Sequence, residues 1–142
     1  GQKVWETPAA LALPCATQNE VDANDVRAMH HHGIELVAEG ANMPLTPGAI
    51  EVAENSKMLF APGKAANAGG VATSALEMQQ NASLQAWPAD VVEEKLEGIM
   101  EDIHSTCLTT AEELDAPGNY MVGANAAGFM KVADAMIQQG VV

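Results

Sequence analysis

Residues 58–70 read MLFAPGKAANAGG, an apolar run that passes directly into small residues with one lysine and one asparagine. Two similar stretches precede it, since residues 34–44 read IELVAEGANMP and residues 11–20 read LALPCATQNE. The three apolar runs begin roughly 23 residues apart, which is about the length of one compact βα unit. This spacing predicts three strands, at residues 11–13, 34–38 and 58–61.

The segments between the predicted strands have the signals of helices. Residues 21–32 precede Gly33, and a glycine commonly follows the last helical residue. Thr46 followed by Pro47 is typical of an N-cap and a first-turn proline, for a helix that runs to about residue 55. Strands joined by helical crossovers are parallel, so all three should end on the same edge of the sheet. Ligands of open α/β sheets bind beyond that edge.

The rest of the chain is predicted to be helical. We expect one helix from Gly70 to about residue 84, a long helix after Pro88, and a last helix over residues 122–139 that ends at Gly140. Apolar residues recur at helical spacing in the second and third of these: Val92, Leu96, Ile99, Ile103 and Cys107, then Phe129, Val132, Ala133, Met136 and Ile137. The predicted fold class is therefore α/β, with about three parallel strands, crossover helices and three C-terminal helices. No repeat or linker interrupts the chain, so residues 1–142 are assigned to one domain.

Composition narrows the classes of function. The net charge is −13 with only six Lys and Arg, so the basic stripe of a nucleic-acid-binding protein is missing. No apolar run is long enough for a transmembrane helix, and no secretory signal opens the chain. The two cysteines, Cys15 and Cys107, lie outside any CxxC pair, which favours a reducing, cytoplasmic compartment.

The loop after each predicted strand combines small residues with carboxamide or hydroxyl groups. Small residues let a ligand approach the backbone, and Thr17, Gln18, Asn42 and Asn67 offer neutral donors and acceptors. Three such loops on one edge are better explained by a shared ligand than by chance. The alternative for each asparagine is that it caps its own turn.

The glycine cluster at residues 63–70 is neither a P-loop nor a GxGxxG fingerprint. If Gly69 and Gly70 begin a helix, their N–H groups can receive a carboxylate, and the Ser74 hydroxyl one turn later can face the same way. The alternative is a turn with tight helix packing, in which Ser74 is an ordinary small residue.

Three further features have simple structural explanations. Lys64 is a catalytic base only if it is tuned by burial, and a salt bridge or a solvated cation is the plainer interpretation. The triplet at residues 30–32, His-His-His, predicts the last turn of a helix, because consecutive helical side chains point in different directions and rarely share a metal ion. Cys15 lacks a His–carboxylate relay, so we expect no covalent nucleophile there, and the histidine geometry leads us to expect no metal site.

Three long motifs in order carry a specific resemblance: LPCATQNE at residues 13–20, VAEGANMP at residues 37–44 and APGKAANAGGVATS at residues 61–74. The similarity continues through GANAAGF at residues 123–129 and KVADAM at residues 131–136. Over nearly its whole length the chain resembles bacterial glutamate dehydrogenases of the small-subunit hexameric class, and the NADP-using members in particular.

The resemblance implies the C-terminal part of a Rossmann-like dinucleotide-binding domain in a homo-hexameric enzyme. The family interconverts L-glutamate with 2-oxoglutarate and ammonium, and NADP or NAD carries the hydride. Cofactor-binding positions carried over from the family motifs are Cys15, Ala16 and Thr17 in the loop that passes the cofactor, Asn42 near the nicotinamide ribose, and Asn67 near the nicotinamide carboxamide. Substrate-binding positions are Gly70, Val71 and Ser74, with Ser74 on the side-chain carboxylate of glutamate.

The chain also departs from the family, whose members are much longer. The family's catalytic lysine and aspartate, its glycine fingerprint and its first strands have no matching positions here, and neither do the residues that choose between NADP and NAD. The resemblance therefore assigns no catalytic residue to this chain, and we expect the chain alone to be inactive. Two alternatives stay open, a non-catalytic nucleotide-binding or subunit-interaction module, and an inactive fragment.

Overall fold

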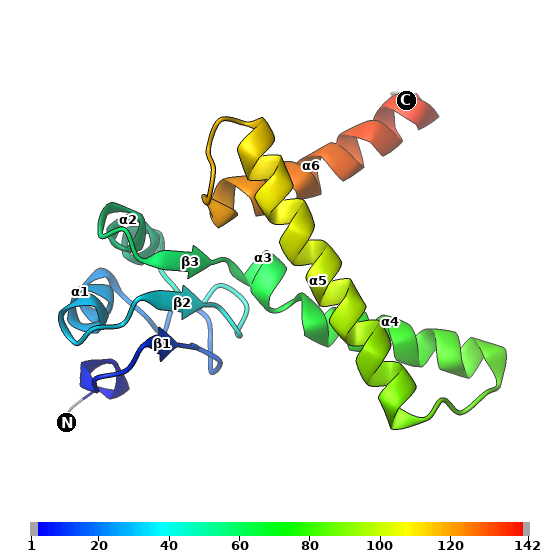
Figure 1. The fold of residues 1–142 in the computed structure, drawn as a ribbon, viewed down its shortest axis with the longest axis horizontal. Helices are drawn as coiled ribbons and strands as arrows, with labels where there is room; N and C mark the ends of the chain where they lie inside the picture. Colours follow the sequence, from blue (N-terminus) through cyan, green and yellow to red (C-terminus); the bar gives the residue numbers. More distant parts are fainter. Residues whose placement is uncertain (1–2, 141–142) are drawn as a thin grey trace. The chain divides into compact units, whose positions relative to one another are not determined.

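The computed structural model of the protein describes residues 3–140. The chain divides between Asn67 and Ala68 into two compact units, the first an α/β unit and the second a helical one (Figure 1). The assignment of the whole chain to one domain stays a prediction.

The first unit contains a three-stranded parallel sheet in the order β1-β2-β3. Its elements are η1 (Val4–Glu6), β1 (Leu11–Ala12), α1 (Ala23–His31), β2 (Leu36–Ala38), α2 (Pro47–Asn55), β3 (Leu59–Ala61) and α3 (Gly63–Ala66). The predicted α/β class and the parallel strands are confirmed. The strands are shorter than predicted, and η1 and α3 were not predicted. Four residues are too few to show a helical period, which explains why α3 was not predicted.

Local capping interactions set the ends of the helices. The Asp22 carboxylate accepts hydrogen bonds from the backbone N–H groups of Asn24 and Asp25, at 2.7 and 3.0 Å, and these bonds lower the pKa of Asp22. The predicted start of α1 at residue 21 is wrong, because Val21 forms a parallel bridge with Leu45 instead.

The cap predictions for Thr46 and Gly33 are confirmed. The Thr46 hydroxyl accepts from the backbone N–H of Ala49 at 3.3 Å, and Pro47 is the first residue of α2. Gly33 has a φ of 86°, the left-handed conformation that favours glycine just past a helix.

The two faces of the sheet differ in burial. Ala12, Val37 and Phe60 form one row across the strands and are buried, on the face where α1 and α2 bury their own apolar side chains. Leu11, Leu36 and Leu59 form the adjacent row on the other face, where Leu11 is 59% and Leu59 is 61% exposed. Within the described residues, this leucine row is largely left open.

The second unit consists of three helices, α4 (Ala68–Ser83), α5 (Ala89–Glu113) and α6 (Tyr120–Gln139), and α5 packs against both of the others. The predicted bounds hold to within two residues. The Asn119 side chain caps α6 by accepting from the N–H of Val122 at 3.0 Å, and Gly140 ends it with a φ of 81°. The predicted apolar face of α6 is largely exposed, for Phe129 is 70% and Ile137 is 77% exposed.

Where α5 and α6 meet, the Tyr120 hydroxyl lies beside two groups of α5. The Cys107 thiol interacts with that hydroxyl and is buried, and the Nδ1 atom of His104 lies 3.3 Å from it. Burial, and then the neighbouring Cys107, raise the pKa of Tyr120 to about 12. Burial likewise raises the pKa of Cys107.

We expect alkaline pH to destabilise this unit through Tyr120. An unfolded tyrosine loses its proton near pH 10, whereas the folded one keeps it to about pH 12. The native state therefore binds more protons in that window, and the free energy of unfolding should fall as the pH rises from about 10 to about 12. Tyr120 is the only tyrosine of the chain, so its tyrosinate absorbance reports the titration directly. Ionisation of the folded protein at the ordinary pKa of tyrosine would contradict this expectation, and Tyr120→Phe should have a flatter stability profile.

Candidate functional site

Three loops leave the carboxyl ends of the strands and are bonded to one another. The backbone N–H groups of Gly40 and Ala41 donate to the carbonyl of Pro14, at 3.0 and 2.9 Å. The Asn67 side-chain amide donates to the carbonyl of Ala41 at 3.1 Å. The loop after β2 therefore bridges the loop after β1 and the segment after β3, which confirms that these three segments share one edge of the sheet.

Glu39 lies at the centre of this loop cluster. Its side chain is buried, with Oε2 accepting from the backbone N–H of Gly63 at 2.6 Å and Oε1 accepting from that of Leu45 at 3.2 Å. Gly63 approaches so closely that an added Cβ would lie 3.1 Å from the carbonyl oxygen of Ala41. No role was predicted for Glu39 from the sequence. An acidic residue that directly follows the apolar strand β2 was the signal that could have identified it.

The loop after β1 carries Cys15, Ala16 and Thr17, and all three are exposed. Glu20 folds this loop back on itself, because its Oε1 atom accepts from the N–H groups of Ala16 and Thr17, at 2.9 and 3.3 Å. A Cβ added to Gly40 would collide with the Cys15 sulfur. Glycine at position 40 thus lets the first loop pack against the second.

The two asparagines predicted to bind the cofactor lie in linked segments. Asn42 is exposed in the loop after β2, and Asn67 is half-buried immediately after α3. The bond from Asn67 to Ala41 brings Asn67 to the residue next to Asn42. The Asn67 carboxamide is therefore tied to the loop that carries Asn42.

The three predicted substrate-binding residues lie in the second unit, in the first turns of α4. The helix begins at Ala68, so the N–H groups of Gly69 and Gly70 are among those that lack intrahelical partners. The Ser74 hydroxyl donates to the carbonyl of Gly70 at 3.3 Å, which places its oxygen alongside the first turn. The first two turns of α4 thus bring together three exposed residues, Gly70, Val71 and Ser74.

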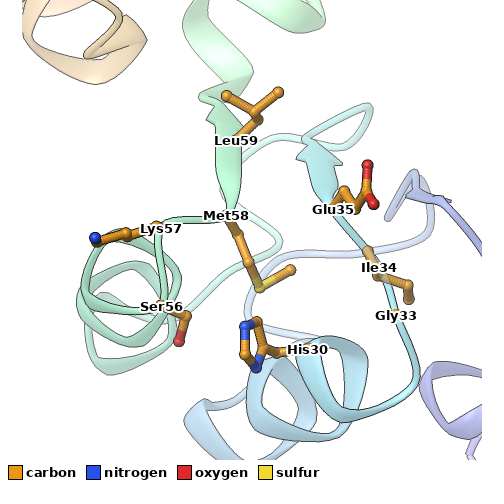
Figure 2. Close-up of a pocket in the computed structure, with 8 residues that line it drawn as sticks. All are labelled: His30, Gly33, Ile34, Glu35, Ser56, Lys57, Met58 and Leu59. Carbon is orange, nitrogen blue, oxygen red and sulfur yellow. The ribbon is translucent and has the colours of Figure 1, made fainter.

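Two of the hollows in the first unit bear on the position of the site. One, of about 600 Å³, runs along β1 and reaches two of the predicted cofactor-binding residues, Cys15 and Ala16. The other, of about 420 Å³, lies at the amino ends of β2 and β3. Figure 2 shows the side chains of His30 and Met58 directed toward each other in this hollow. The second hollow is at the end of the strands opposite the three loops, so it does not belong to the site that they form.

The histidine triplet forms the last turn of α1 and its cap, as predicted. Among residues 3–140, no group of three His, Cys, Asp or Glu side chains is arranged to hold a metal ion. In the same part of the chain, no helix combines the length and apolar character that crossing a membrane requires.

Comparisons with known proteins agree with the sequence motifs. Residues 1–140 match the family described as Glutamate/Leucine/Phenylalanine/Valine dehydrogenase. The chain is 54% identical over 142 residues to the NADP-specific glutamate dehydrogenase of Escherichia coli strain K12, covering 100% of this chain and 32% of that protein. It is 50% identical, with the same coverage, to the NAD-specific glutamate dehydrogenase of Bacteroides fragilis strain YCH46.

A solved structure gives the same result for the fold. The crystal structure of Plasmodium falciparum glutamate dehydrogenase matches with a TM-score of 0.95 at 44% identity, covering 99% of this chain and 30% of that chain. The chain thus spans about a third of the length of the relatives that it matches.

Proposed function

The chain belongs to the glutamate/leucine/phenylalanine/valine dehydrogenase family, and we propose that it is the C-terminal part of the dinucleotide-binding domain of an NAD(P)-dependent glutamate dehydrogenase. The intact enzyme interconverts L-glutamate with 2-oxoglutarate and ammonium and assembles as a homo-hexamer. Similar relatives are named NADP-specific and NAD-specific, which supports a nicotinamide dinucleotide without choosing between the two.

The observation that carries this proposal is the joined edge of three loops beyond parallel strands. Ligands of open α/β sheets bind at such an edge. The residues there fit a nicotinamide: small side chains leave room for a flat ring, and the neutral carboxamides of Asn42 and Asn67 can pair with the ribose and the nicotinamide carboxamide. Cys15, Ala16 and Thr17 line the passage of the rest of the cofactor.

The start of α4 has the chemistry to bind glutamate. N–H groups at a helix N-terminus favour a carboxylate, and the Ser74 hydroxyl can rotate from the Gly70 carbonyl to donate to the same ligand. Gly70, Val71 and Ser74 therefore contact the amino acid, with Ser74 at its side-chain carboxylate.

A bound nicotinamide dinucleotide would supply or accept the hydride that is exchanged with glutamate. The residues of this chain orient the two reactants, which converts a bimolecular encounter into a positioned transfer. None of the residues of this chain is assigned to proton transfer. The lysine and aspartate that handle protons and the imine in the family belong to the remainder of the enzyme.

Steady-state assays test the proposal. The intact protein should oxidise glutamate with NADP or with NAD, whereas the 142-residue chain alone should show no turnover, because it lacks the family's proton-transferring groups. Turnover by the chain alone would show that the proton-transferring groups lie within these 142 residues, contrary to the proposal. An intact protein that is inactive with both coenzymes would contradict the dehydrogenase assignment.

A subunit-interaction module is the second candidate, and the exposed end of α6 favours it. Phe129, Met130, Val132, Met136 and Ile137 are each more than half exposed within one helix. A patch of this kind commonly marks an interface. An intact protein that self-associates but neither binds coenzyme nor turns over glutamate would support this candidate.

A further inference from the structure

Two acidic side chains are buried among the described residues, Asp25 and Glu39. Burying a carboxyl group is costly unless hydrogen bonds or an ion pair compensate for the lost water. Asp25 has such an explanation, because it pairs with Lys3 at 2.7 Å and completes the cap of α1 with Asp22. Glu39 is compensated differently, because both of its carboxyl oxygens accept hydrogen bonds from backbone N–H groups.

Those N–H groups come from two separate segments. Leu45 closes the loop that carries Asn42, and Gly63 opens α3, which carries Asn67 at its end. The bond to Gly63 is short, at 2.6 Å, and joins residues 24 positions apart in the sequence. One carboxyl group thus fixes both ends of one loop and the start of another segment, while Asn67 adds a second tie through Ala41.

We infer that Glu39 is a positioning residue of the coenzyme site: its buried carboxyl group sets the spacing between the segments that carry Asn42 and Asn67. This inference rests on the proposed function. Glu39 does not reach the ligand in this role and acts through the two asparagines. A side chain of the same length without a second acceptor oxygen should leave one N–H group unpaired and let the segments separate.

The test is Glu39→Gln in the intact enzyme, with Glu35→Gln as the matched control. Both variants remove one acid from the same stretch of chain, but Glu35 is exposed and lies at the amino end of β2, away from the loops. In Glu39→Gln we expect kcat for glutamate oxidation to fall about 10-fold and the Kd of reduced coenzyme, followed by its fluorescence, to rise by a similar factor. The KM for glutamate should stay within about twofold. Glu35→Gln should match the wild type in all three quantities.

The outcomes separate the inference from the proposed function. If Glu39→Gln melts at a lower temperature but keeps the wild-type kcat and coenzyme Kd, Glu39 only braces the fold and the inference is overturned. If the wild type binds reduced coenzyme but does not turn over glutamate, the proposed reaction fails, and weaker coenzyme binding by Glu39→Gln still supports the positioning role.

A second measurement serves if Glu39→Gln does not fold. In the wild-type protein, the amides of Leu45 and Gly63 should exchange slowly with solvent, and saturating coenzyme should slow both further, because both are tied to the same group. Fast exchange at these two amides, or no response of either one to coenzyme, would overturn the inference.

Discussion

Replacing Gly123 by alanine should lower the free energy of unfolding of the helical unit by about 3 kcal/mol. Gly123 lies in α6 against the backbone of Cys107 in α5. An added Cβ would overlap the Cys107 carbonyl oxygen and would lie 2.7 Å from its carbonyl carbon. These are backbone atoms that cannot rotate aside, so the two helices would have to separate and lose the packing around the buried Cys107.

Gly128→Ala is the matched control for this substitution. Gly128 lies in the same helix, is exposed, and an added Cβ would meet nothing within 4 Å. Alanine there should raise stability by up to about 1 kcal/mol through its better helix propensity. Denaturant unfolding followed by circular dichroism measures both variants. Equal stability changes in the two variants would show that the helix crossing tolerates a side chain at position 123.

Replacing Asn67 by alanine in the intact enzyme should reduce kcat/KM for glutamate oxidation by about 100-fold. The substitution removes the hydrogen bond to the Ala41 carbonyl, which ties the segment after β3 to the loop after β2. On the proposed function it also removes a partner of the nicotinamide carboxamide. Both losses act on the orientation of the nicotinamide, so the effect should exceed that of Glu39→Gln.

Two further variants serve as comparisons for Asn67→Ala. Asn55→Ala, at the exposed end of α2, changes the same residue type away from the loops and should leave kcat/KM unchanged. Asn67→Asp keeps the size of the side chain but replaces the donor to Ala41 with an acceptor, so it should be at least as impaired as Asn67→Ala. Wild-type kcat/KM in both Asn67 variants would remove this residue from the proposed site.

The sequence predicted the features that depend on short-range chemistry. The Thr46-Pro47 pair and the glycines at 33 and 140 mark helix ends through interactions within a few residues, and each was placed correctly. The even spacing of apolar runs predicted three parallel strands, because a βα unit has a characteristic length. From the parallel strands, the common edge of the loops followed directly.

Features that depend on partners distant in the sequence could not be predicted from local patterns. The start of α1 was misplaced because Val21 bridges to Leu45, and no local pattern announces that pairing. The role of Glu39 depends on the Gly63 N–H group, which only the folded chain brings near. The apolar face of α6 was predicted from residues that recur at helical spacing. Whether that face is buried or exposed depends on what packs against it, which the spacing does not reveal.

The open leucine row of the sheet has a consequence for how molecules of this chain behave toward one another. Leu11 and Leu59 face water, so two chains attract each other wherever these rows can touch. The net charge of −13 opposes that approach over long distances. Salt shortens the repulsion to about 10 Å at 0.1 M and leaves the attraction between apolar surfaces intact. Ionic strength therefore determines whether copies of the isolated chain associate or stay apart.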